Sequence, residues 1–150
     1  MSKEIKTSGL EYLYQEGDLY AIVLRDNYKG DSIRFFTPDS FSQQLGYLPH
    51  KKGAVIKPHE HQINKREIHY TQEVLLIKKG RVQVNFYDLD HMPVFSEVLD
   101  SGDMILLCGG GHGFEMLLDT VMIEIKQGPY TGANDKNIFE GAYSLYDSYK

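Results

Sequence analysis

The chain alternates short apolar segments with turn residues. The apolar segments are rich in β-branched and aromatic residues, which favour strands. Turn residues such as Gly30-Asp31, Lys79-Gly80 and Ser101-Gly102 separate them. The pattern predicts strands over residues 19–26, 32–38, 53–58, 73–79, 81–88, 94–100, 103–108 and 120–127. Short strands with frequent turns are typical of an all-β sandwich or barrel.

Residues 81–88 show the clearest alternation along the chain. The two sets are Val82, Val84 and Phe86 on one face, and Gln83, Asn85 and Tyr87 on the other. Successive side chains of a strand point to opposite faces of its sheet. The segment therefore predicts a half-buried strand with one apolar face.

Residues 39–48 fit two structures. They follow Pro38, and Asp39 or Ser40 could cap one helical turn there. The same residues could also form another strand. The sequence leaves both possibilities open.

The C-terminal residues carry an aromatic stripe. Phe139, Tyr143 and Tyr146 follow one another at spacings of four and three, and Asn134 could cap a short helix. Such a stripe is typical of a packing face. We therefore predict that residues 129–150 form a tail or short helix that packs on the barrel or on a partner subunit.

Length and composition predict one domain. The chain has 150 residues and shows no repeat, low-complexity segment or linker. That length suffices for a single core, which we place over residues 15–128.

The net charge of −5 argues against nucleic acid or an anionic membrane as the main partner, because no basic face accompanies it. The longest apolar run, Met104–Cys108, is too short to cross a bilayer, and the N-terminus lacks the apolar core of a signal peptide. A single cysteine fits a reducing compartment. These features predict a cytoplasmic protein.

Histidines carry the candidate chemistry. His59 and His61 stand two residues apart, so a strand would present both imidazoles on one face. Neighbouring imidazoles of this kind can reach one transition-metal ion. Glu73 heads the next apolar segment, where an unpaired carboxylate is costly to bury, and His112 follows the run "CGGG".

These residues resemble the two motifs of the cupin family. The first motif is matched by residues Gly53, His59, His61, Glu73 and Gly80. The segment "GDMILLCGGGH", from Gly102 to His112, resembles the second motif. The resemblance implies a double-stranded β-helix, or jelly-roll barrel, in which His59, His61, Glu73 and His112 hold one divalent transition metal.

The chain departs from the cupin pattern at several places. Eleven residues, 62–72, separate His61 from Glu73, and this insert either shapes the mouth of the barrel or lengthens a hairpin. Glu67 is the alternative carboxylate, but no glycine follows it at the spacing of the motif. In the second motif, Cys108 replaces a proline, Met116 replaces an asparagine, and the turn before His112 is shorter.

The resemblance also implies a range of functions. Three imidazoles and a carboxylate suit Fe, Mn, Ni, Co, Cu or Zn as the metal. We expect an enzyme for a small polar metabolite, with sugar isomerase or epimerase chemistry in which the metal acts as a Lewis acid. The alternatives are an Fe(II)-dependent dioxygenase and a non-catalytic module that binds a small ligand such as a sugar. The resemblance also favours a homodimer.

A proton carrier would complete such an enzyme. The candidates are Lys57, His69, Tyr70 and Glu115. Lys57 could instead pair with a substrate carboxylate or phosphate. For each of them, a solvated position at a strand end, in a loop or on the surface is the simpler alternative.

Overall fold

A computed structural model describes residues 2–132 and 135–141 of the chain. All regular structure within these residues is β-strand, with no helix, so the all-β prediction is confirmed. The chain divides into two compact units. The first, here called the sandwich unit, comprises Met1–Tyr28 and Gln72–Lys150, and the second is Lys29–Thr71.

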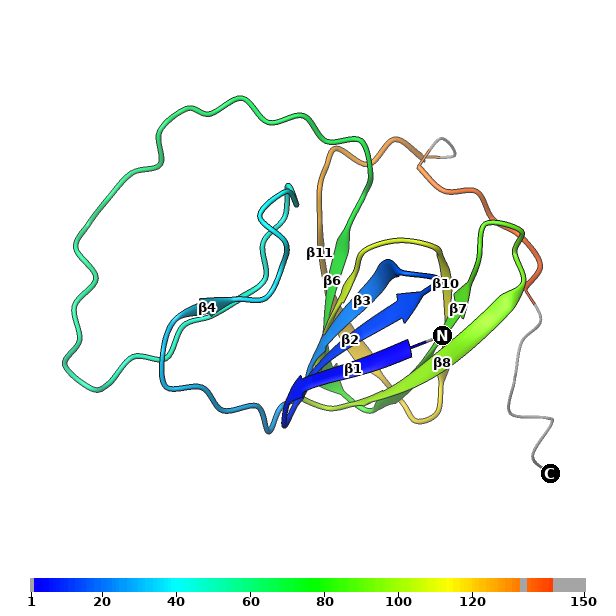
Figure 1. The fold of residues 1–150 in the computed structure, drawn as a ribbon, viewed down its shortest axis with the longest axis horizontal. Coiled ribbons are helices and arrows are strands. Elements are labelled where there is room, and N and C mark those ends of the chain that lie inside the picture. Colours follow the sequence, from blue (N-terminus) through cyan, green and yellow to red (C-terminus); the bar gives the residue numbers. More distant parts are fainter. Residues whose placement is uncertain (1, 133–134, 142–150) are drawn as a thin grey trace. The chain divides into compact units, whose positions relative to one another are not determined.

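The sandwich unit contains two antiparallel sheets (Figure 1). The larger has the order β1 (Ser2–Thr7), β2 (Leu10–Gln15), β3 (Asp18–Leu24), β9 (Met104–Leu107), β6 (Glu73–Lys79) and β11 (Val121–Lys126). The smaller has the order β10 (Gly111–Met116), β7 (Arg81–Tyr87) and β8 (Pro93–Asp100). Strand β1 begins at Ser2 and β2 ends at Gln15, so the sheet begins earlier in the chain than residue 15, where we placed the start of the core.

The core lies between the two sheets. Its buried residues are Leu13, Tyr20, Ala21, Val23, Leu75, Ile77, Val82, Val84, Phe86, Phe95, Leu99, Ile105 and Leu107. Phe86 stacks on Phe95 with ring centroids 4.5 Å apart, and Tyr20 contacts Phe95 at 6.0 Å. Both sheets contribute residues to this one cluster, because each strand alternates an inward apolar set with an outward set.

Strand β7 differs from its prediction on one face. Its apolar face is buried as expected, but Gln83 and Asn85 on the other face are also buried, at 1% and 5% exposure. Gln83 Nε2 donates to Asn85 Oδ1 (2.8 Å), and Ser96 Oγ donates to the same oxygen (2.6 Å). These hydrogen bonds offset part of the cost of burying the polar groups, although Gln83 Oε1 is buried without a hydrogen-bond partner among the described residues. The prediction of a half-buried strand was therefore wrong.

The β6–β7 turn depends on Gly80. This residue has φ +96°, and a Cβ there would lie 2.4 Å from the Asp119 carbonyl oxygen. Gly17 has a similar φ of +94° but no atom within 4 Å of its Cβ position. We expect Gly80→Ala to cost about 2 kcal/mol of unfolding free energy, and Gly17→Ala about 1 kcal/mol. Urea denaturation of the two variants measures this difference, and equal losses would contradict it.

A charged cluster joins the two sheets at one side of the core. We call Lys3, Glu11, Arg25, Glu97 and Asp103 the Arg25 cluster. Arg25 Nη1 donates to Asp103 Oδ2 (3.0 Å) and to the carbonyl of Val98 (2.7 Å), and Nη2 pairs with Glu11 (3.0 Å) and Glu97. Lys3 Nζ lies 2.6 Å from Glu11 and 3.0 Å from Glu97.

The Arg25 cluster makes stability depend on pH. Burial alone would raise the pKa of the Glu11 carboxyl, but hydrogen bonds from Arg25 and Lys3 lower it below its ordinary value. A lowered folded-state pKa gives stability that is present above the unfolded-state value and is lost as the pH falls through the folded-state value. Glu11 therefore stabilises the fold at neutral pH and loses this contribution in acid.

We expect the unfolding free energy of Glu11→Gln to fall less steeply with decreasing pH than that of the wild type. Unfolding free energies of the wild type and the variant, measured from about pH 6 down to about pH 3, should converge as the pH falls. Glu16→Gln, in the exposed β2–β3 turn, is the control and should keep the wild-type slope. Parallel curves for Glu11→Gln and the wild type would contradict the prediction.

The Lys29–Thr71 unit contains one short hairpin. Its strands are β4 (Arg34–Phe35) and β5 (Gly46–Tyr47), which pair antiparallel. Gln44 Nε2 donates to the carbonyls of Pro38 (3.1 Å) and Phe41 (3.0 Å), which holds the connection as a turn. Residues 39–48 therefore form neither a helical turn nor a full strand, and the strand predicted over 32–38 is reduced to two residues.

The strand predicted over residues 53–58 is absent from the structure, and residues 48–71 contain no strand. Ala54 N donates to Lys51 O (3.0 Å), so its backbone belongs to a turn. Pro58 has no N–H to offer a neighbouring strand. The prediction of a strand from the apolar residues of this segment was therefore wrong.

The C-terminal prediction is tested only in part. Residues 135–141 contain no helix, while Asn134, Tyr143 and Tyr146 lie outside the described residues. Phe139 does pack as predicted: its ring stacks on His91 at 3.9 Å and meets Tyr87 edge-on at 5.3 Å. No helix among the described residues is long and apolar enough to span a bilayer.

Candidate functional site

Glu73 and His112 meet inside the sandwich unit. Glu73 is the first residue of β6 and lies opposite Leu107, and His112 lies on β10 opposite Phe86. Paired residues of neighbouring strands point to the same side of a sheet, and Leu107 and Phe86 belong to the core, so both site side chains point inward. His112 Nε2 lies 3.2 Å from Glu73 Oε2, although the two residues are 39 positions apart. The Glu73 side chain is only 7% exposed. The fold thus brings two of the four predicted metal ligands together.

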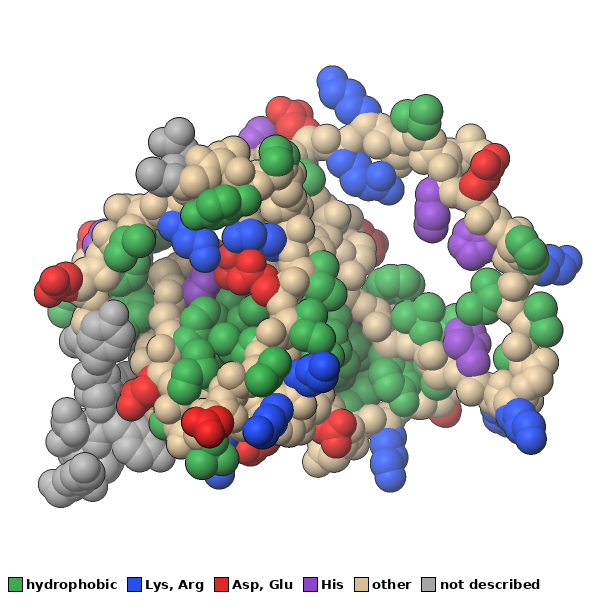
Figure 2. Space-filling model, turned by 180° about the vertical axis from the view of Figure 1, so that it is seen from behind, with side chains coloured by type: hydrophobic (Ala, Val, Ile, Leu, Met, Phe, Trp, Pro, Cys, Tyr) green, Lys and Arg blue, Asp and Glu red, His purple; other side chains and the backbone are tan. Residues whose placement is uncertain are grey.

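Two lysines approach the other oxygen of Glu73. Lys126, opposite Glu73 on β11, places Nζ 3.6 Å from Oε1, and Lys136 places Nζ 3.8 Å from the same atom. Lys126 also lies 3.4 Å from Glu124 and 3.5 Å from Asp135. In Figure 2, basic, acidic and histidine side chains meet at a hollow that has hydrophobic side chains inside it.

These neighbours keep Glu73 ionised. The hydrogen bond with His112 lowers the pKa of the Glu73 carboxyl and outweighs burial, and Lys136 and Lys126 lower it further. For Lys126, burial alone would lower the pKa, but Glu124, Glu73 and Asp135 raise it above its ordinary value. At neutral pH the site therefore holds a carboxylate beside at least one ammonium group.

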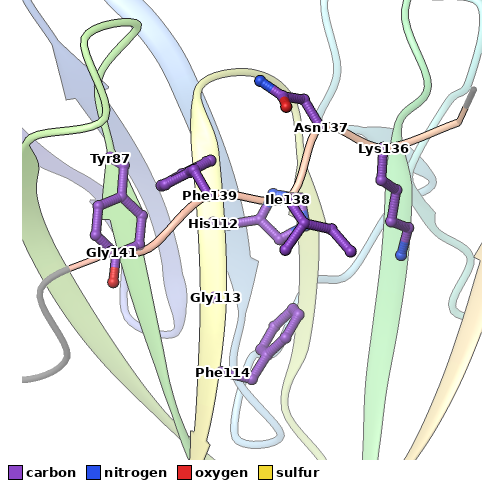
Figure 3. Close-up of a pocket in the computed structure, with 9 residues that line it drawn as sticks. All are labelled: Tyr87, His112, Gly113, Phe114, Lys136, Asn137, Ile138, Phe139 and Gly141. Carbon is purple, nitrogen blue, oxygen red and sulfur yellow. The ribbon is translucent and has the colours of Figure 1, made fainter. Parts of the chain in front are cut away.

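A cavity of about 270 Å³ opens beside His112. It is lined by Tyr87, His112, Gly113, Phe114, Lys136, Asn137, Ile138, Phe139 and Gly141. Figure 3 shows the Ile138 side chain next to the His112 ring, with Phe114 further along β10 and Lys136 on the opposite side of Ile138. One imidazole, one ammonium and aromatic rings therefore surround a space of small-molecule size.

Residues 136–141, here called the C-terminal strap, form one wall of this cavity (Figure 3). Glycines make its close approach to the sheet possible. A Cβ on Gly111 would lie 2.9 Å from the Phe139 ring, and a Cβ on Gly141 would lie 2.7 Å from the Tyr87 ring. Together with the stacking of Phe139 on His91, these contacts fix the strap on β10 and β7.

The other predicted ligand pair lies in the Lys29–Thr71 unit. The rings of His59 and His61 have centroids 5.4 Å apart, and both residues are exposed. His59 Nδ1 lies 2.9 Å from the carbonyl oxygen of Lys57. A nitrogen that donates to a carbonyl carries the proton, so Nε2 keeps the lone pair that metals bind. His59 therefore offers a ring nitrogen of the kind that binds metals, and His61 lies next to it.

The four predicted proton carriers stand in exposed positions. Lys57, His69 and Tyr70 are exposed in the Lys29–Thr71 unit, and His69 Nε2 lies 3.5 Å from Glu67. Glu115 pairs with Gln83, so it lies on the face of β10 opposite to that of His112. Their roles in proton transfer stay predictions.

Two further observations bear on metal and thiol chemistry. Among residues 2–132 and 135–141, no group of three or more His, Cys, Asp or Glu side chains is gathered closely enough to hold a metal ion. Burial raises the pKa of the Cys108 thiol to about 12, so it is protonated at neutral pH and is a poor nucleophile. A metal centre therefore remains a proposal, and thiol catalysis finds no support.

The sequence did not reveal Lys126, Lys136 or Phe139 as site residues. Lys126 had a detectable signal, because it shares the inward face of its strand with Met122, which packs on the core. Lys136 had none, since it follows the last strand. Chain order alone does not tell which face of the sandwich such a segment crosses.

No family model matches the chain, and neither a curated protein nor a solved structure matches it significantly.

Proposed function

We propose that the chain is a metal-binding barrel protein of the cupin type that acts on a small polar metabolite. The observation that carries this proposal is the contact of Glu73 with His112. The two cupin-like motifs single out these residues, and they come from different sheets to meet beside a cavity. Two packed antiparallel sheets are also what a jelly-roll barrel requires.

The motif residues occupy consistent places in the strands. Glu73 opens β6 and Gly80 forms the turn after it, as the first motif implies. Gly102 forms the turn before β9, with φ +92°, and His112 lies on β10, as the second motif implies. These placements support the cupin assignment for the part of the chain after residue 72.

The residues fit a divalent transition metal by their chemistry. Glu73 is an ionised, buried carboxylate, and His59 has a ring nitrogen free for a metal. We propose that Glu73 and His112 are ligands of one ion of Fe, Mn, Ni, Co, Cu or Zn, and the cupin resemblance implies His59 and His61 as its further ligands. When bound, such an ion supplies Lewis acidity to the oxygen atoms of a substrate.

The cavity favours isomerase or epimerase chemistry on a sugar-like substrate. Phe114 and Phe139 offer aromatic surface to one side of a ring, while His112 and Lys136 offer polar groups to its hydroxyls or carbonyl. A positioned imidazole or ammonium can carry a proton between neighbouring carbons. His112 and Lys136 thus join Lys57, His69, Tyr70 and Glu115 as candidates for that role.

A second candidate function is non-catalytic binding of a small ligand. It is favoured by the pairing of Glu73 with His112, Lys126 and Lys136, which satisfies the carboxylate without any substrate. In that case His61→Ala would weaken ligand binding, and no wild-type turnover would exist for it to abolish.

Metal analysis tests the proposal. Protein purified without a histidine tag should contain about one equivalent of a transition metal per chain after growth in supplemented medium. Metal far below stoichiometry, both as purified and after incubation with each of the six ions, would overturn it.

A further inference from the structure

We propose that the ligand of the His112 cavity is anionic, and that Lys136 binds its phosphate or carboxylate group. The inference rests on the proposed function, because it takes the same cavity as the metabolite site. It adds a substrate class, an acidic sugar or a sugar phosphate, and it assigns specificity to a residue of the C-terminal strap.

Lys136 has binding capacity that the described residues do not use. Among the described residues its one ion pair is with Glu73 Oε1, at 3.8 Å, which is beyond hydrogen-bond distance. Its side chain is 53% exposed and lines the cavity. Lys126, by contrast, is only 18% exposed and is shared among Glu73, Glu124 and Asp135. An ammonium group has three N–H donors, so Lys136 can donate hydrogen bonds to an anionic ligand.

Glu73 has partners other than Lys136. Its Oε2 accepts from His112, and its Oε1 already faces Lys126. Among the described residues that line the cavity, Lys136 carries the formal charge, and no carboxylate lines it. This placement favours a ligand that carries negative charge.

The strap holds Lys136 at the cavity. Phe139, three residues further on, is packed between His91 and Tyr87, so the segment that carries Lys136 is anchored on the sheet. Figure 3 shows Lys136 and Ile138 descending from this segment toward the cavity. An anchored lysine loses less conformational freedom on binding than one on a free tail.

Three matched probes test the charge requirement. Glucose 6-phosphate, glucuronate and glucose have the same ring and differ in charge, so titration calorimetry with each separates phosphate, carboxylate and neutral ligands. We expect the better anionic probe to bind the wild type at least about tenfold more tightly than glucose. Equal affinities for all three, or no binding of either anion, would overturn the proposal.

Two lysine variants test the residue assignment. Lys136→Gln should weaken binding of the better anionic probe about tenfold, while Lys79→Gln, at the exposed far end of β6, should leave it unchanged. Thermal melts of both variants check that the fold is kept. If the affinity of Lys136→Gln equals that of the wild type, or if both variants lose affinity equally, the assignment of Lys136 is wrong.

Metal content measured on the same preparations separates the two proposals. A metal-replete wild type whose anion affinity is unaffected by Lys136→Gln overturns the ligand inference alone. A metal-free wild type that still needs Lys136 for anion binding overturns the metal centre and supports the ligand inference.

Discussion

Replacing Arg25 by methionine is expected to destabilise the sandwich unit by about 3–5 kcal/mol. Arg25 is 19% exposed, and it pairs with three carboxylates, on Glu11, Glu97 and Asp103. Methionine keeps much of the side-chain volume but removes every donor. The carboxylates would then be left partly buried. Among the described side chains, Lys3 would still pair with Glu11 and Glu97.

Arg81→Met is the matched control for this change. Arg81 pairs with Asp100 at 3.5 Å, and the two side chains are 50% and 58% exposed. An exposed pair of this kind contributes about 0–1 kcal/mol. Urea unfolding of both variants at neutral pH measures the difference. If Arg25→Met costs no more than Arg81→Met, the Arg25 cluster is not a structural element of the core.

The second large effect concerns metal affinity. His112→Ala is expected to weaken binding of a divalent transition metal by more than about 100-fold, because it removes a ligand rather than an outer partner. It also leaves Glu73 without its closest hydrogen-bond partner. Competition titration against a chromophoric chelator measures the affinity.

His50→Ala is the control, since His50 is exposed and stands outside both motifs. It should keep the wild-type affinity. His61→Ala should behave like His112→Ala if the histidine pair belongs to the same centre. A loss in His50→Ala as large as that in His112→Ala would mean that metal binds to surface histidines instead.

The strands of the sandwich were predictable because inward apolar residues alternate along them. Glu73 and His112 were singled out by their positions beside apolar segments and by the resemblance to the cupin motifs, not by this alternation. Strands β1 and β2 were both missed. The residues of β1, Ser2–Thr7, are mostly polar, and its pairing with β2 is a backbone property. The alternation of apolar and polar residues therefore located the central strands better than the strands at the edge of the sheet.

The errors came from interactions that a local pattern does not contain. The polar face of β7 was predicted to be solvated, yet Gln83 and Ser96 both donate to Asn85, and the three side chains are wholly or partly buried. Residues 53–58 have the apolar composition of a strand, but Ala54 belongs to a turn and the segment ends at Pro58. Lys136 reaches Glu73 only because the C-terminal strap returns to β10 and β7.

The measurement that tests the central proposal most directly is X-ray absorption spectroscopy of the metal-loaded protein. It counts imidazole and carboxylate ligands at the metal without knowledge of the substrate. We predict three imidazoles and one carboxylate, with metal–nitrogen distances of about 2.0–2.2 Å. The same spectrum from His112→Ala should lose one imidazole. A wild-type spectrum with only oxygen ligands, or one that His112→Ala leaves unchanged, would contradict the assignment.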